Sequence, residues 1–153
     1  MSAEDTVKDF MIALEAKDFD TAASYLSDDF VFSGWTPQPL DKDQFLTVMR
    51  ELKAGLPNLS YHFHTVKDVH DLEQEDSVKA AIQITGTQTE GFILPPLGLP
   101  PIPQMARTVS LPEEAWSYTL QGGKIARIVV HRVPGGGIQG LLHQLDIHVP
   151  IIQ

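Results

Sequence analysis

The chain has 153 residues, a formal net charge of −9 and no cysteine. This length predicts one domain over residues 1–153. The acidic balance, with no run of basic residues, argues against nucleic acid and membrane surfaces as partners. The lack of cysteine excludes disulfides and thiolate chemistry. An acidic N-terminus and the absence of any apolar run of about 18 residues make a cytoplasmic protein the expectation.

Three amphipathic helices are predicted in the first third of the chain. Apolar residues recur at helical spacing over residues 4–16, 20–26 and 41–53. Asp41 and Gln44 form a capping-box pattern at the start of the third helix, and Gly55 ends it. Asp28 and Asp29 are expected to end the second helix, and a short strand over residues 30–35 is predicted to follow them.

The pattern changes to strands from Leu59 onward. Residues 61–64 alternate aromatic side chains with histidines, and residues 76–91 predict one long strand that is apolar at its start and polar at its end. Two further strands, 107–120 and 125–133, are joined by a hairpin turn, and a short helix follows over 138–147. This order predicts an α+β fold, with a curved, mostly antiparallel sheet covered by three N-terminal helices and a short C-terminal helix.

An apolar, proline-rich loop over residues 92–105 interrupts the strands. Its prolines hold the backbone extended, and its apolar side chains need cover. We expect this loop either to roof a pocket or to pack against a partner subunit.

Five runs of residues span nearly the whole chain: DFMIALEAKDFDTAASYLSDDFVF, LKAGLPNLSYHFHTVKDV, DSVKAAIQITGTQTEGF, YTLQGGKIARI and LLHQLDI. With the order of helices and strands, these runs resemble the nuclear-transport-factor-2-like superfamily, and within it the SnoaL-like polyketide cyclase group. The most specific parts are residues 84–89 and the turn at 122–125. The resemblance implies a cone-shaped α+β fold, a pocket inside the cone and a homodimer formed through the outer face of the sheet.

The chain departs from the cyclase pattern at two positions. In cyclase members an Asp on the penultimate strand acts as acid or base, and aligning the turn at 122–125 places Trp116 at that position. Gln88 stands where the family has a His in the middle strand. Neither an indole nor an amide can exchange a proton as those residues do.

Glu114 is the first candidate for acid or base chemistry. Strand periodicity places Glu114 on the same face as Trp116 and Tyr118, where burial against the indole would raise the pKa of the carboxyl. The alternative is that residues 112–114 form a kinked, solvated strand end. We favour this alternative at the sequence level, because charged residues are seldom buried unpaired.

Two further residues are candidates for proton transfer. Glu90 lies on the face of Gln88 and is expected either to pair with Arg107 at the rim of a pocket or to be an exposed turn charge. His131 lies near the end of the last strand among apolar neighbours, so its direction cannot be read from the pattern.

The predicted ligand-binding residues are mostly aromatic. Trp35, Tyr61, Trp116 and Tyr118 would line a pocket for a flat or polycyclic apolar ligand, with Gln88 and Arg107 adding polar contacts. His62 and His64 share one face of a strand, but Tyr61 and Phe63 are better core residues. We therefore expect the histidines to point outward and predict no metal site.

Two functions are consistent with this sequence. One is a cofactor-independent enzyme of the cyclase, isomerase or hydrolase kind, which acts on a small apolar molecule by acid–base chemistry. The other is a non-catalytic module that holds such a ligand or serves for dimerisation. No phosphate-binding loop, nucleophile motif or metal cluster points to another class.

Overall fold

The computed structural model describes residues 3–36, 38–66, 77–94, 101–104 and 106–145. Three helices lie in the N-terminal part of the chain, as predicted: α1 (Ala3–Glu15), α2 (Phe19–Ser24) and α3 (Lys42–Gly55). The Asp41 side chain accepts a hydrogen bond from the Gln44 amide, and the Gln44 side chain accepts one from the Asp41 amide. The predicted capping box is therefore confirmed.

The main sheet has six strands in the order β2-β1-β8-β7-β4-β3. Their bounds are β1 (Leu26–Ser33), β2 (Leu40–Asp41), β3 (His64–Val66), β4 (Ser77–Ile82), β7 (Glu114–Gln121) and β8 (Lys124–His131). Neighbouring strands are antiparallel except β1 and β8, which run parallel. The α+β fold is thus confirmed, with a mixed rather than fully antiparallel sheet.

Two details of the first strands differ from prediction. Asp28 and Asp29 do not end the second helix, because α2 already ends at Ser24 and both residues lie within β1. Strand β3 begins only at His64, because His62 adopts a left-handed backbone conformation with a φ of 44°. The alternation at residues 61–64 nevertheless separates a buried Tyr61 from exposed histidines.

The long strand predicted over residues 76–91 is broken between Ile82 and Thr85. Strand β4 pairs with β3 and β7, whereas β5 (Thr85–Thr87) pairs with β6 (Thr108–Ser110) in a separate two-stranded sheet. The strand predicted over 107–120 is broken at the same level, between β6 and β7. The Leu111 amide donates to the Ile84 carbonyl at 2.9 Å across this bend, so both strands leave the main sheet together.

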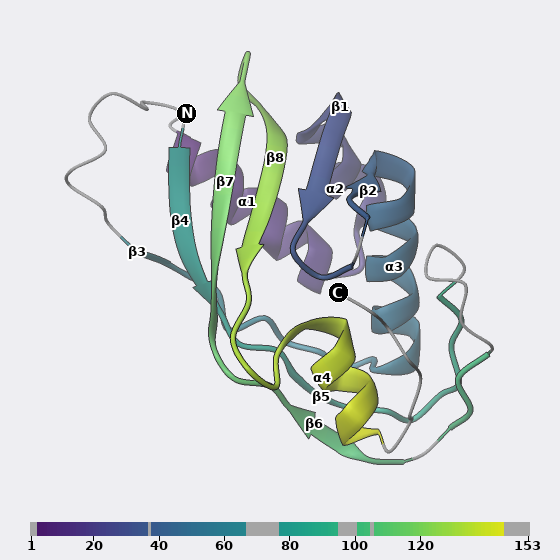
Figure 1. The fold of residues 1–153 in the computed structure, drawn as a ribbon. Helices are drawn as coiled ribbons and strands as arrows, with labels where there is room; N and C mark the ends of the chain where they lie inside the picture. Colours follow the sequence, from purple (N-terminus) through teal and green to yellow (C-terminus); the bar gives the residue numbers. More distant parts are fainter. Residues whose placement is uncertain (1–2, 37, 67–76, 95–100, 105, 146–153) are drawn as a thin grey trace.

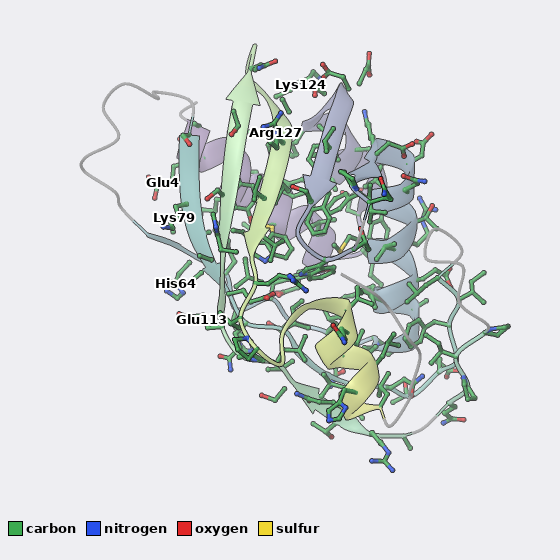
Figure 2. All side chains as sticks on the ribbon, in the orientation of Figure 1. Glu4, His64, Lys79, Glu113, Lys124 and Arg127 are labelled. Atoms are coloured by element: carbon green, nitrogen blue, oxygen red, sulfur yellow. The ribbon has the colours of Figure 1, made fainter. Side chains whose placement is uncertain are left out.

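The inner face of the main sheet is covered by helices. Alternate residues of β7 are buried, and α1 contacts β4 while α3 contacts β1 (Figure 1). One continuous apolar core lies between these layers. Figure 2 labels Lys79 on β4 and Arg127 on β8, and the strand register places both on the opposite, outer face.

Helix α4 (Gly137–Gln144) lies at the lower end of the sheet in Figure 1, beside β5 and β6. The Gln144 side chain accepts a hydrogen bond from the Ser110 amide and donates one to the Ser110 carbonyl, both at 2.8 Å. The end of the helix predicted over 138–147 falls beyond the described residues. Among the helices described, none combines the length and apolar content needed to cross a bilayer.

The described parts of the proline-rich loop pack on α3. Phe92 and Ile102 form a two-way backbone bridge, and both side chains are buried with Leu94 in the core. The Ile93 amide donates to the Glu51 side chain at 3.0 Å. Residues 95–100 and 105 of this loop lie outside the described residues.

Candidate functional site

The Glu114 carboxylate is buried, with only 5% of the residue exposed. Glu114 is the first residue of β7, directly after the bend in the sheet, and pairs with Ile82 of β4. Its Oε1 accepts a hydrogen bond from Trp35 Nε1 at 3.4 Å, and its Oε2 accepts one from the Val133 amide at 3.4 Å. The interpretation of residues 112–114 as a solvated strand end is therefore wrong for Glu114, although the neighbouring Glu113 is exposed (Figure 2).

Burial raises the pKa of the Glu114 carboxyl above its ordinary value, because the apolar surroundings disfavour the charged form. Several contacts act in the opposite direction and lower this pKa. They are, in decreasing order, the hydrogen bonds from Trp35 and from the Val133 amide, the charge of Arg132 and the hydrogen bond from the Gly137 amide. Burial therefore favours the neutral carboxyl, whereas all of the polar contacts favour the carboxylate.

The first turn of α4 lies directly against Glu114. Gly136 is the N-cap residue of this helix, and a Cβ atom at Gly136 would lie 2.5 Å from Glu114 Oε2. The glycine turn before α4 thus lets the backbone approach the carboxylate, and the positive end of the helix dipole faces it. The sequence predicted no role for this turn, although the run of glycines at 135–137 is a pattern that allows close backbone approach.

The predicted aromatic residues come together beside Glu114. The Trp116 ring lies 5.6 Å from the Trp35 ring, 6.4 Å from the Tyr61 ring and 6.3 Å from the Tyr118 ring, measured between centroids. All four side chains are almost fully buried. Phe32 lies edge-on to both indoles, at 5.3 Å from Trp35 and 5.5 Å from Trp116. The structure therefore assembles one aromatic cluster on the inner face, with the carboxylate at one end.

The polar atoms of this cluster are hydrogen-bond donors with few good acceptors. Trp116 Nε1 is buried and has no hydrogen-bond partner among the residues that the structure describes. The Tyr61 hydroxyl donates to Met49 Sδ at 3.5 Å, and the Tyr118 hydroxyl donates to Met11 Sδ at 3.3 Å. A thioether sulfur is only a weak acceptor. Burial raises the pKa of both tyrosine hydroxyls, so both remain protonated donors at neutral pH.

The remaining predicted residues lie away from this cluster. Gln88 is fully buried, and its side chain donates to the Pro103 carbonyl at 2.8 Å. Glu90 and Arg107 are exposed. His131 is exposed on the outer face of the sheet, where its Nε2 lies 2.8 Å from Ser117 Oγ. The structure thus brings Glu114 to the aromatic cluster but not Glu90 or His131.

The two histidines of the His-x-His pattern are also separated from the core. Both are exposed, and His62 Nε2 lies 2.8 Å from Thr85 Oγ1. Across the residues that the structure describes, no three His, Asp or Glu side chains gather as a metal site would require.

A half-open cleft of about 590 Å³ lies on the other side of the glycine turn. Its lining includes Arg132, Pro134, Gly136, Gln139 and His143. None of the residues predicted from the sequence lines it. Gly136 therefore lines the cleft and also lies directly against the buried Glu114 carboxylate.

Comparison of solved structures identifies the same fold in several bacterial proteins. A candidate polyketide cyclase from Xanthomonas campestris superposes with a TM-score of 0.68 at 15% identity, covering 94% of this chain and 96% of that one. A candidate SnoaL-like polyketide cyclase from Jannaschia sp. CCS1 gives 0.69 at 17% identity, with coverages of 96% and 93%. An epoxide hydrolase from M. tuberculosis gives 0.61 at 18% identity, with coverages of 94% and 92%. At these identities the likeness establishes the fold alone.

No curated protein sequence matches this chain. The SnoaL-like domain model, by contrast, matches residues 7–128. That match covers α1 to α3, the bent strands, β7 and most of β8, and so includes Glu114 and the whole aromatic cluster. The chain therefore belongs to the SnoaL-like domain family of the nuclear-transport-factor-2-like superfamily.

Proposed function

We propose that this protein binds a small apolar molecule beside the aromatic cluster and that Glu114 exchanges a proton with it, without a cofactor. The burial of the Glu114 carboxylate at the end of this cluster carries the proposal. A titratable group with a pKa displaced by burial is a common mark of an active site. A carboxyl whose pKa rises toward neutrality is better suited to act as a general base or acid. The reaction class would be that of a cyclase, isomerase or hydrolase; a candidate polyketide cyclase and an epoxide hydrolase share this fold.

The first test is mass spectrometry of the purified protein, native and then after solvent extraction. A stoichiometric apolar compound released by the solvent would support the binding site and provide a scaffold for turnover assays. In those assays Glu114→Gln should lower kcat at least about 100-fold, the usual scale of a general acid or base, and change ligand affinity little. Full turnover by the Gln variant would contradict the catalytic role of Glu114.

The second candidate function is a non-catalytic module that holds a ligand or dimerises. It is favoured by the fact that both Glu114 oxygens already accept hydrogen bonds from the chain itself. In that case the carboxylate stabilises the start of α4 and takes no part in chemistry. Glu114→Gln would then lower stability, while the protein would retain its ligand and show no turnover before or after the change.

A homodimer through the outer sheet face forms part of the same proposal. Small residues Ala81, Ala115 and Ser117 lie on this face in β4 and β7, and allow a flat partner to approach closely. Ala115→Arg should shift the native mass from dimer to monomer. A monomeric wild-type protein at micromolar concentration would contradict the dimer.

A further inference from the structure

Three of the four polar side chains in the aromatic cluster lack an oxygen acceptor among the described residues, whereas the fourth, Trp35, donates to Glu114. In the described part of the chain Trp116 Nε1–H has no hydrogen-bond partner, and the Tyr61 and Tyr118 hydroxyls donate to methionine sulfurs. An unmade hydrogen bond of a buried donor is costly, and native proteins keep few such groups without a reason. The interior is therefore rich in donors that lack oxygen acceptors.

The sulfur contacts are ones that a ligand could replace. Met11 lies on α1 and Met49 on α3, so both reach the cluster from the helical layer. Methionine is unbranched and flexible, and can adopt another rotamer at low cost. An oxygen acceptor is stronger than a thioether, so a ligand oxygen would compete well for either hydroxyl.

The charges near the cluster limit the ligand further. Glu114 lies on the same inward face of β7 as Trp116, two residues earlier. The chain as a whole carries a net charge of −9. Among the described residues Lys53 is the buried cation, and its ammonium already donates to the Leu59 carbonyl. An anionic ligand would therefore meet a buried carboxylate with no unengaged buried cation in the described part of the chain to offset its desolvation. An uncharged acceptor avoids this cost.

We infer that the ligand of this protein is an uncharged, largely apolar molecule with a carbonyl or ether oxygen, and that Trp116 Nε1–H selects it by donating a hydrogen bond to that oxygen. The inference rests on the proposed function and specifies the ligand class for the same site. It also gives a role to Trp116, the residue that replaces the acidic side chain of cyclase members. At this position the Trp116 indole would bind a ligand oxygen, whereas the carboxylate of cyclase members would transfer a proton.

The test compares three probes of similar size by titration of ¹⁵N-labelled protein: 1-indanone, indane and indane-1-carboxylate. The chain has two tryptophans, so Trp116→Phe assigns the indole N–H signal of Trp116 directly. We expect 1-indanone to shift that signal downfield and to bind about 3- to 10-fold more tightly than indane, the range for one neutral hydrogen bond. The carboxylate should bind most weakly.

The variant Trp116→Phe keeps an aromatic ring and removes the N–H. Its preference for 1-indanone over indane should be smaller than that of the wild type, and any remainder would come from the Tyr61 and Tyr118 hydroxyls. The control Phe32→Leu alters a ring that contacts Trp116 but has no polar atom. It should change both affinities by the same factor and leave the preference for the ketone intact.

Two outcomes would contradict the inference, and only the second would also contradict the proposed binding function. Equal binding of 1-indanone and indane to the wild type, or an unchanged preference in Trp116→Phe, would reject the role of Trp116 while the binding function stands. If neither probe shifts any core resonance at millimolar concentration, both the binding function and this inference fail.

Discussion

Trp35 Nε1 donates a hydrogen bond to Glu114 Oε1 at 3.4 Å, between residues 79 positions apart in the chain. The bond joins the segment after β1 to the first residue of β7, and both side chains are buried. The Trp116 ring lies 5.6 Å from the Trp35 ring and is equally buried, but its indole N–H has no hydrogen-bond partner within the described ranges. Substituting each of these two tryptophans by Phe therefore isolates the contribution of the hydrogen bond to Glu114.

Trp35→Phe should therefore destabilise the protein more than Trp116→Phe. Both changes leave a similar cavity, but only the first removes a donor from a buried carboxyl. We expect an additional loss of about 1 kcal/mol in the free energy of unfolding, at the low end for such a bond because it is long. Urea denaturation of the two variants measures the difference, and equal losses would show that the hydrogen bond contributes nothing.

The pH dependence of stability should depend on Glu114. Because its pKa is raised in the native state, the native protein holds this proton more tightly than the unfolded chain does. The stability contributed by this group is fully present below the ordinary pKa of 4.5 and is lost as pH rises through the native pKa. Glu114→Gln abolishes this pH-dependent loss of stability, because the amide does not titrate.

The stability of Glu114→Gln relative to the wild type should thus increase as pH rises. Urea denaturation below pH 4.5 and again at about pH 8 measures the change. Glu113→Gln serves as the control, since it removes an exposed carboxylate from the same strand end. A relative stability that falls with pH would show that the hydrogen bonds to the carboxylate outweigh its burial.

Gly136→Ala should be destabilising because of Glu114 and not because of the backbone. Gly136 has a φ of −97°, which any residue can adopt, but its Cβ would lie 2.5 Å from Glu114 Oε2. We expect a loss of about 1–3 kcal/mol, as for other overpacked sites. In a Glu114→Ala background the same change should cost almost nothing.

The control for this double-mutant cycle is Gly135→Ala. Gly135 has a φ of +82°, and a Cβ there would meet no atom within 4 Å. Its cost of about 1–2 kcal/mol comes from the left-handed backbone alone and should be the same in both backgrounds. Chemical denaturation of the two cycles tests this, and a Gly136→Ala cost that persists without Glu114 would contradict the proposed contact.

Gln144→Ala should loosen α4 from the two-stranded sheet. The change removes both 2.8 Å hydrogen bonds to the Ser110 backbone, and we expect a loss of about 1–2 kcal/mol. Backbone amides of α4 should then exchange with solvent faster, while those of β7 and β8 stay protected. Gln139→Ala, at an exposed position of the same helix, should leave exchange unchanged. Uniform acceleration across the sheet would mean that α4 does not open independently.

The helices could be predicted from the sequence because their signals are local. Asp41 and Gln44 cap α3 within one turn, and the apolar spacing of α1 repeats over its whole length. The break between β4 and β5 could not be predicted in the same way. Ile82, Ile84 and Gln88 are all buried, so the alternation continues unchanged while the strand exchanges its partners. An alternating pattern of residues shows which side chains are buried, but it does not show which strand is the hydrogen-bonded neighbour.

The burial of Glu114 depends on partners far away in the sequence. Its immediate neighbours, Pro112 and Glu113, indicate a solvated strand end, and Glu113 does face solvent. The contacts that bury Glu114 come from Trp35, before the third helix, and from Val133, after the last strand. Strand phase correctly placed Glu114 with Trp116 and Tyr118, but no local pattern could show that the chain would return to cover it.

The parallel pairing of β1 with β8 has a consequence for how the protein is made. Phe32 lies beside Ile128 in the sheet, so β1 has its neighbour on this side only after synthesis has passed β8. Pairings between distant segments form slowly, because a large loop must close before any contact stabilises it. During translation, the apolar side of β1 is therefore covered only by the N-terminal helices until β8 has been made. The nascent chain is most exposed to aggregation during this interval.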